Sequence, residues 1–257
     1  MSNEFKNIAI ERDESKVKII LNRPPLNILN IEMLEEINIA LNRFCDDSNL
    51  RAVIIAAHGK AFSAGVDIKD HTEEKVDKMI KVFHEMFKNL SLTKAPTIAL
   101  VNGVALGGGC ELALFCDLVV ASEKAEFGQP EIKVGVFPPI AAIIFPKLTG
   151  IKKTLELILT GETITANEAK ELGLINIVLP AENFDALADE FIKKIITNSA
   201  VVLHLAKRSI YDTAGLSYDN AIKKIEDLYL NKLMKTEDAK EGLRAFLEKR
   251  KPVWKNK

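Results

Sequence analysis

Two glutamates, Glu111 and Glu131, have the residue type and the setting for proton transfer. Glu111 directly follows the glycine-rich residues 107–110, and Glu131 follows Gln129 and Pro130. Their separation is 131 − 111 = 20 residues, which is enough for a short helix, a strand and a return to nearly the same place. Carboxylates that converge beside backbone N–H donors can move protons next to an oxygen that gains negative charge. This combination suits addition or removal of water beside a carbonyl; the alternative is two ordinary surface acids.

Two glycine-containing turns must position this chemistry. Residues 107–110 follow an apolar strand and open a short helix, so a ligand oxygen can approach the free N–H groups of the first turn. Residues 60–69 also follow an apolar strand and contain small residues. Neither turn has the GxGxxG or GK[ST] pattern of a nucleotide site. Together with the acids, the turns contain the parts of a hydration site. Taken alone, the glycines could simply ease a tight turn and Glu111 could simply complement a helix dipole.

Apolar, β-branched runs alternate with amphipathic patterns in the first 160 residues. We expect strands at residues 17–22, 51–57, 97–103 and 117–122, and helices at residues 31–44 and 72–92. Such alternation is typical of an α/β domain with mostly buried strands.

The strand signal fades after residue 160. Thr165 and Glu168 form a capping-box pattern, and helical spacing continues over residues 183–196, 200–214, 219–233 and 236–249. We therefore divide the chain into an α/β core, residues 1–195, and a C-terminal helical region, residues 196–257. A helical tail of this kind either docks on another subunit or covers the core of its own.

The composition is that of a soluble globular protein. Of the 257 residues, 47% are hydrophobic and 28% are charged, with a formal net charge of −1. This charge gives no general attraction to nucleic acid or to an anionic membrane, and no apolar run reaches membrane-spanning length. Residues 1–6 lack the basic and apolar regions of a signal peptide. We expect a cytoplasmic protein without nucleic-acid or membrane partners.

The cysteines and histidines suggest no further chemistry. The three cysteines form no CxxC pair, and their odd number is typical of reduced thiols in a reducing compartment: Cys45, Cys110 and Cys116. The histidines are dispersed, without HExxH or paired-ligand spacing: His58, His71, His84 and His204. We therefore predict no metal site.

Six segments in order resemble the enoyl-CoA hydratase/isomerase (crotonase) superfamily over nearly the whole chain. They are LNRPPLNILN (residues 21–30), AFSAGVDIK (61–69), NGVALGGGCELALFCD (102–117), AEFGQPEIKVGVFP (125–138), GETITANEAKELGLI (161–175) and FLEKRKPVW (246–254). The resemblance implies an α/β spiral of ββα units with a C-terminal helical region that packs homotrimers, often paired into hexamers. It also implies an acyl-CoA thioester substrate and no separate cofactor.

The resemblance assigns roles to four residues of the two turns and the acid pair. The backbone N–H groups of Val66 and Gly108 would form an oxyanion hole for the thioester oxygen. Glu111 and Glu131 would hold a water molecule between them, as in the hydratases of this superfamily. We assign Glu111 as the base for water and Glu131 as the proton donor to carbon. The reverse partition stays open, and the pair can titrate as a unit.

The same resemblance implies where coenzyme A binds. Six residues of the turn at residues 60–69 would contact coenzyme A: Lys60, Ala64, Val66, Asp67, Ile68 and Lys69. Phe246 and Lys249 of the tail would also reach coenzyme A, within the chain or across a subunit boundary. For the lysines the alternative is plain solvation.

The chain departs from many hydratases after Gly135, where a PGxGGTQRL-like stretch is replaced by PPIAAIIFP. We predict a stiffer, more apolar acyl pocket at Pro139, Ile140 and Ile143; the alternative is repacking of the core. With the short loop at residues 24–27, this wording resembles the cyclohexa-1,5-diene-1-carbonyl-CoA hydratases of anaerobic aromatic degradation.

These features lead us to expect hydration of the cyclic dienoyl-CoA to 6-hydroxycyclohex-1-ene-1-carbonyl-CoA. The first alternative is a straight-chain enoyl-CoA hydratase of fatty-acid β-oxidation. Others are a different crotonase reaction, such as isomerisation, decarboxylation or hydrolysis, and a non-catalytic RNA-binding homologue.

Overall fold

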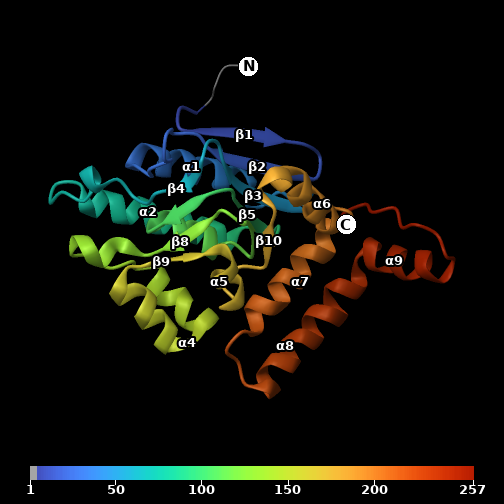
Figure 1. The fold of residues 1–257 in the computed structure, drawn as a ribbon. Coiled ribbons are helices and arrows are strands. Elements are labelled where there is room, and N and C mark those ends of the chain that lie inside the picture. The colour runs from blue at the N-terminus through green and yellow to red at the C-terminus, as the bar shows by residue number, and fades with distance from the viewer. Residues whose placement is uncertain (1–4) are drawn as a thin grey trace.

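The computed structural model describes residues 5–257, whose strands form two sheets (Figure 1). The first sheet has the order β1 (Ile8–Arg12), β2 (Lys16–Leu21), β3 (Ala52–Ala57), β5 (Thr97–Val101), β7 (Leu118–Ser122) and β10 (Ile177–Leu179). The second has the order β4 (Ala61–Ser63), β6 (Val104–Leu106), β8 (Glu126–Gly128) and β9 (Thr163–Thr165). The pairs β1–β2 and β8–β9 are antiparallel, and all other pairs are parallel. The predicted α/β class is confirmed.

The parallel strands are buried on both faces. In β3, Val53 and Ile55 join the main core, whereas Ile54 on the opposite face joins a smaller cluster. This second cluster includes Phe184 of α6 (Phe184–Ile196), which covers that face. Because successive side chains alternate between faces, both faces of β3 need apolar residues. This explains the uninterrupted apolar run in the sequence.

The helices of the first half lie close to their predicted positions. Helix α1 spans Ile31–Phe44, as expected, and the side chain of Asn30 caps its N-terminus by accepting a hydrogen bond from the Met33 N–H at 3.1 Å. Helix α2 (Val76–Leu92) starts four residues later than predicted, because residues 72–75 form a turn. The glycine-rich segment at residues 107–110 opens the short helix α3 (Gly108–Phe115).

Residues 141–179 differ more from the prediction. Strands β9 and β10 lie where the strand signal had faded. Helix α4 (Ala141–Thr160) is broken by a kink at Gly150, whose φ of 76° is not helical. Helix α5 (Ala166–Glu171) begins with the predicted capping box: Thr165 and Glu168 exchange hydrogen bonds. The short helices η1 (Ile68–Asp70), η2 (Pro130–Val134), η3 (Ala181–Asn183) and η4 (Leu233–Lys235) complete the connections.

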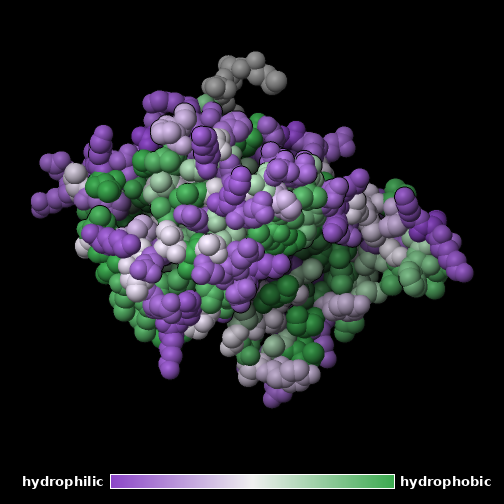
Figure 2. All heavy atoms as spheres, viewed as in Figure 1, coloured by the Kyte–Doolittle hydropathy of each residue, from purple (hydrophilic) through white to green (hydrophobic). Residues whose placement is uncertain are grey.

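The C-terminal helices α7 (Ala200–Thr213), α8 (Tyr218–Asn231) and α9 (Glu237–Leu247) extend away from the sheets (Figure 1). This confirms a C-terminal helical region, while the boundary between residues 195 and 196 stays a prediction. Many large apolar side chains are exposed here, and pale and green spheres mark them over α8 and α9 in Figure 2.

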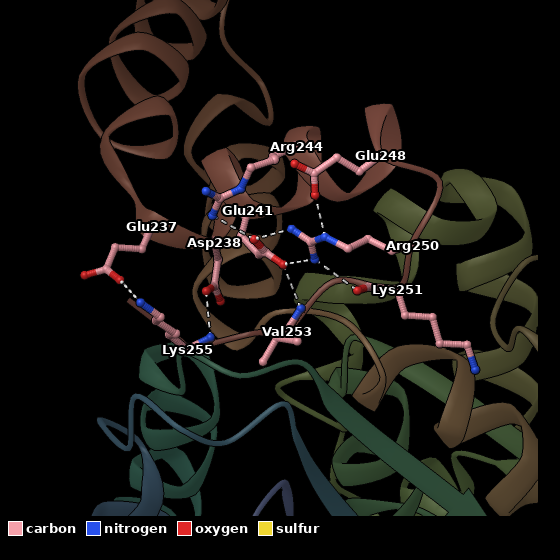
Figure 3. A network of polar contacts seen from close by, with 9 residues as sticks. All are labelled: Glu237, Asp238, Glu241, Arg244, Glu248, Arg250, Lys251, Val253 and Lys255. Atoms are coloured by element: carbon pink, nitrogen blue, oxygen red, sulfur yellow. Dashed lines mark hydrogen bonds and ion pairs between the residues drawn. The ribbon is translucent and has the colours of Figure 1, made fainter.

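Residues 250–257 return along α9 and fix it through polar contacts (Figure 3). Arg250 pairs with Glu241 of α9, with Nη1 and Oε1 separated by 2.6 Å. Asp238, buried at the start of α9, accepts a hydrogen bond from the backbone N–H of Lys255 at 2.7 Å. These contacts hold α9 so that Phe246 projects from the molecule, with 82% of its surface exposed.

Among residues 5–257, no helix combines the length and apolar character needed to cross a bilayer. The three cysteines are free. Residues 1–4, part of the segment used to exclude a signal peptide, lie outside the described residues. The cytoplasmic location stays a prediction.

Candidate active site

A cavity of about 580 Å³ lies between α2, η2, the start of α3 and the turns that follow β4 and β6. Both glutamates singled out from the sequence line it, as do both predicted N–H donors. Its lining consists of Ala64, Gly65, Val66, Ile68, His71, Val76, Met79, Ile80, Phe83, Gly107, Gly108, Glu111, Pro130, Glu131, Lys133, Val134, Gly135, Val136, Phe137 and Pro139. The fold thus brings together residues from Val66 to Glu131, which are 131 − 66 = 65 positions apart in the sequence.

Glu111 is a buried acid held by the start of a second helix. It lies in the first turn of α3 and is 1% exposed. Its Oε1 accepts hydrogen bonds from the N–H groups of Ile140 and Ala141, at 2.7 and 2.8 Å, where α4 begins. Burial raises the pKa of Glu111 to about 7, and the charge of Glu131 adds to the rise, although the two N–H groups oppose it. Glu111 therefore exchanges protons near neutral pH.

Glu131 reaches the same cavity from η2. Its Oε1 lies so close to Gly107 that a Cβ at that position would clash with the carboxyl group. Gly107 also has a φ of +50°, which favours glycine. Burial raises the pKa of Glu131 to about 7. Its Oε2 is buried without a hydrogen-bond partner in the described chain, so the protonated form is favoured and one oxygen is free for a ligand.

Within residues 5–257, the N–H groups of Val66 and Gly108, the two predicted oxyanion donors, have no hydrogen-bond acceptor, and the two residues are adjacent. The parallel bridge between Leu29 and Val66 uses the carbonyl of Gly65 and the N–H of Asp67, so the Val66 N–H is left free. The Gly108 N–H belongs to the first turn of α3, where helical N–H groups have no helical acceptor. The Val66 side chain occupies the space that a Cβ on Gly108 would need. Both N–H groups can therefore donate to one ligand oxygen.

The other predicted residues divide into those that line the cavity and those that do not. Ala64, Ile68 and Pro139 line it. Lys60, Asp67 and Lys69 do not, and Asp67 instead accepts a hydrogen bond from the Lys69 N–H at 3.1 Å. Their contact with coenzyme A stays a prediction.

Two of the three predicted acyl-pocket residues do not line the cavity, and their contact with the acyl chain stays a prediction. Ile140 is buried beneath the cavity wall and contributes its backbone N–H to Glu111. Ile143, one turn into α4, is 57% exposed. Only Pro139 of this set lines the wall.

Phe246 and Lys249 do not line the cavity of their own chain. Helix α9 lies at the opposite side of the molecule from α2, which forms the cavity wall (Figure 1). Their contact with coenzyme A, within the chain or across a subunit boundary, stays a prediction.

Sequence reasoning missed the apolar wall supplied by α2. Its cavity residues are Val76, Met79, Ile80 and Phe83. Their spacing of three, four and seven residues is that of one helix face. This pattern is visible in the sequence, but it equally fits a helix packed on the core.

Fold and site together define a class of protein: an α/β enzyme of the crotonase type, with paired carboxyl groups facing paired backbone N–H donors. Residues 11–257 match the family model described as enoyl-CoA hydratase/isomerase. The chain belongs to this family, which confirms the predicted superfamily.

Individual relatives agree with this assignment. The chain is 38% identical to a probable mitochondrial enoyl-CoA hydratase of Dictyostelium discoideum, over 98% of this chain and 93% of the relative. It is 35% identical to a short-chain-enoyl-CoA hydratase of Clostridium acetobutylicum, over 96% of this chain and 97% of the relative. A crystal structure of enoyl-CoA hydratase from Mycobacterium smegmatis matches with a TM-score of 0.92 at 32% identity, covering 97% of this chain and 99% of that chain.

These relatives support the predicted enzyme class, a hydro-lyase of the enoyl-CoA hydratase type. They do not support the predicted cyclic dienoyl-CoA substrate, because neither relative is named for it. The departure at Pro139 that suggested a ring substrate alters one wall residue, while the neighbouring Ile140 and Ile143 lie outside the cavity. The straight-chain alternative fits the relatives better.

Proposed function

We propose that this enzyme adds water to the double bond of straight-chain 2-enoyl-CoA thioesters. The observation that carries the proposal is that one cavity is lined by the buried carboxyl group of Glu111, the half-buried carboxyl group of Glu131 and two N–H donors that have no acceptor among residues 5–257. The names of the relatives supply the substrate class.

The thioester oxygen binds between the N–H groups of Val66 and Gly108. As water attacks the β-carbon, electrons of the double bond move toward this oxygen and the two N–H groups stabilise the charge. Loss of one donor from such a hole typically costs about 3–4 kcal/mol of transition-state stabilisation. The new C–O bond forms at the β-carbon, and the α-carbon takes up a proton.

Glu111 removes a proton from the water and Glu131 delivers one to the α-carbon. The two N–H groups of α4 favour the carboxylate form of Glu111, as a base requires. The buried, unpaired Oε2 of Glu131 favours its protonated form, as an acid requires. A pKa near 7 lets each residue recover its starting state between turnovers.

The direct test is turnover of crotonyl-CoA, followed by loss of the conjugated thioester absorbance. Glu111→Gln and Glu131→Gln should each lower kcat by about 100-fold or more, because general acid–base groups typically contribute about 10²–10⁴-fold. Full hydration activity in either variant would contradict the role of that glutamate, and absence of crotonyl-CoA hydration by the wild type would argue for another crotonase reaction. Fast hydration of the cyclic dienoyl-CoA and none of crotonyl-CoA would restore the ring substrate.

We further propose that the chain acts as a homotrimer or a hexamer formed by two trimers. Exposed apolar side chains of the C-terminal helices support this, since patches of this kind commonly mark interfaces: Ile210, Tyr211, Tyr218, Tyr229, Leu230, Leu243, Phe246 and Leu247. Association would bring Phe246 and Lys249 to the coenzyme A of a neighbouring subunit. Sedimentation of a single monomeric species at micromolar concentration would contradict this.

A further inference from the structure

One titratable side chain of the cavity, that of His71, has no role in the proposed reaction and is not fully exposed to solvent. Within the described lining, four side chains are polar: His71, Glu111, Glu131 and Lys133. The two glutamates carry out the proposed proton transfers, and Lys133 is an exposed side chain of η2. His71 is half-buried and comes from the turn between η1 and α2.

His71 lies in the turn that joins η1 to α2, the helix of the apolar wall, and its backbone N–H donates to the carbonyl of Ile68 at 3.0 Å. It immediately precedes Thr72, whose carbonyl accepts the N–H of Val76 at 2.9 Å and so joins the turn to α2. At the other end of this wall, Phe83 packs against Gly108, a predicted oxyanion donor. Seven residues of helix separate Val76 from Phe83, or about 10 Å. His71 therefore lies near the Val76 end of a wall that begins at the reacting carbonyl.

The orientation of the imidazole is fixed by its own turn. Nδ1 lies 3.1 Å from the carbonyl oxygen of Asp67. Because a carbonyl only accepts hydrogen bonds, Nδ1 carries the hydrogen. In the neutral ring, Nε2 is then left with a lone pair and acts as an acceptor. Within residues 5–257, Nε2 has no hydrogen-bond partner.

We propose that His71 determines specificity by accepting, at Nε2, a hydrogen bond from a hydroxyl group on the acyl part of the substrate. This rests on the proposed hydration of 2-enoyl-CoA and names the substrate class within it: enoyl thioesters with a hydroxyl beyond the reacting carbons. A purely hydrocarbon acyl chain displaces water from Nε2 and leaves this nitrogen without a hydrogen-bond partner. A site built around such a hydrogen bond therefore binds the hydrocarbon substrate less well than the hydroxylated one.

The test compares hex-2-enoyl-CoA with its 4-, 5- and 6-hydroxy analogues. The readout is the ratio of kcat/KM between each analogue and the parent, because this ratio is insensitive to the amount of folded enzyme. We expect at least one hydroxy analogue to be preferred about tenfold. His71→Phe should abolish the preference, and His71→Gln, which keeps an acceptor oxygen, should restore part of it. His84→Phe is the matched control, since His84 is exposed on α2 outside the cavity lining, and should keep the wild-type ratio.

Each outcome bears on a different claim. Good hydration of hex-2-enoyl-CoA without any hydroxyl preference, or a preference that survives His71→Phe, would overturn the role of His71 and leave the proposed function intact. An ω-carboxy analogue of hex-2-enoyl-CoA, assayed in parallel, should not be preferred over the parent; a preference for it would overturn the role of His71 as well, because a carboxylate needs a protonated imidazole. Absence of hydration of every enoyl-CoA would refute the proposed function itself.

Discussion

Replacement of Glu111 by glutamine should stabilise the folded protein at alkaline pH while it removes activity. The carboxyl group is 1% exposed, and burial raises its pKa from the ordinary value of 4.5 to about 7. An unfolded chain releases the proton near pH 4.5, whereas the folded protein keeps it until about pH 7. Between these values the folded state binds more protons, so the stability of the wild type falls as pH rises. Glutamine does not titrate and escapes this loss.

The size of the effect follows from the pKa difference. A rise from 4.5 to about 7, at about 1.4 kcal/mol per pH unit, corresponds to about 3 kcal/mol. The free energy of unfolding of Glu111→Gln relative to wild type should therefore increase by about this amount between pH 4.5 and pH 8. The glutamine Oε1 can still accept from the N–H groups of Ile140 and Ala141, so the local structure should be retained.

Urea unfolding across this pH range, at one fixed protein concentration, measures the difference. Glu241→Gln serves as a control of opposite sign, because the hydrogen bond from Arg250 lowers the pKa of Glu241 to about 2. Its carboxylate stabilises the fold above its unfolded pKa, so that variant should lose stability at neutral pH and recover it as pH falls towards 2. A difference between Glu111→Gln and wild type that stays constant with pH would refute the raised pKa, and with it the proposed proton transfer near neutrality.

Three further predictions follow from the site and the tail. Gly107→Ala should lower kcat by about 100-fold with the fold retained by circular dichroism, because its Cβ would displace the carboxyl of Glu131; near-normal kcat would contradict the placement. Ile140→Pro removes one of the two N–H donors to Glu111 and should move the acidic limb of the pH–kcat/KM profile to higher pH; an unchanged limb would separate that hydrogen bond from catalysis. Phe246→Ala should raise KM for acyl-CoA with little change in kcat. Mixing it with the Glu131→Gln protein should produce active mixed oligomers, and no gain on mixing would speak against contact across subunits.

The sequence predicted the long elements well and the short ones poorly. Helix α1 and strand β3 have enough residues for a period to be recognised, and both lie within a residue of their expected bounds. All four strands of the second sheet have three residues, too few for any pattern. Strand β10, also three residues long, was missed for the same reason.

The candidate site was predictable where the residue types themselves indicate the backbone geometry. Glycine at 107 and 108, with an acid three residues on, indicated a helix start with free N–H groups. The partner of Glu111 was not predictable, because Ile140 and Ala141 contribute backbone N–H groups, which any residue except proline carries. The side chains of α4 that face the cavity were not predictable either, because the start of the helix decides their direction and no cap residue marked that start.

The hydrogen bonds from the start of α4 to Glu111 affect how such an enzyme can adapt to a different pH. The two N–H groups that donate to the carboxyl lie at the N-terminus of α4. Buried residues such as Phe145, which is 2% exposed, pack this helix against the core. Hydrogen-bond strength falls steeply with separation, so a small shift of this helix changes the proton affinity of the acid. Substitutions under α4 can therefore retune the working pH without changing any atom that meets the substrate. Two homologues with identical catalytic glutamates can in this way suit cells with different internal acidity.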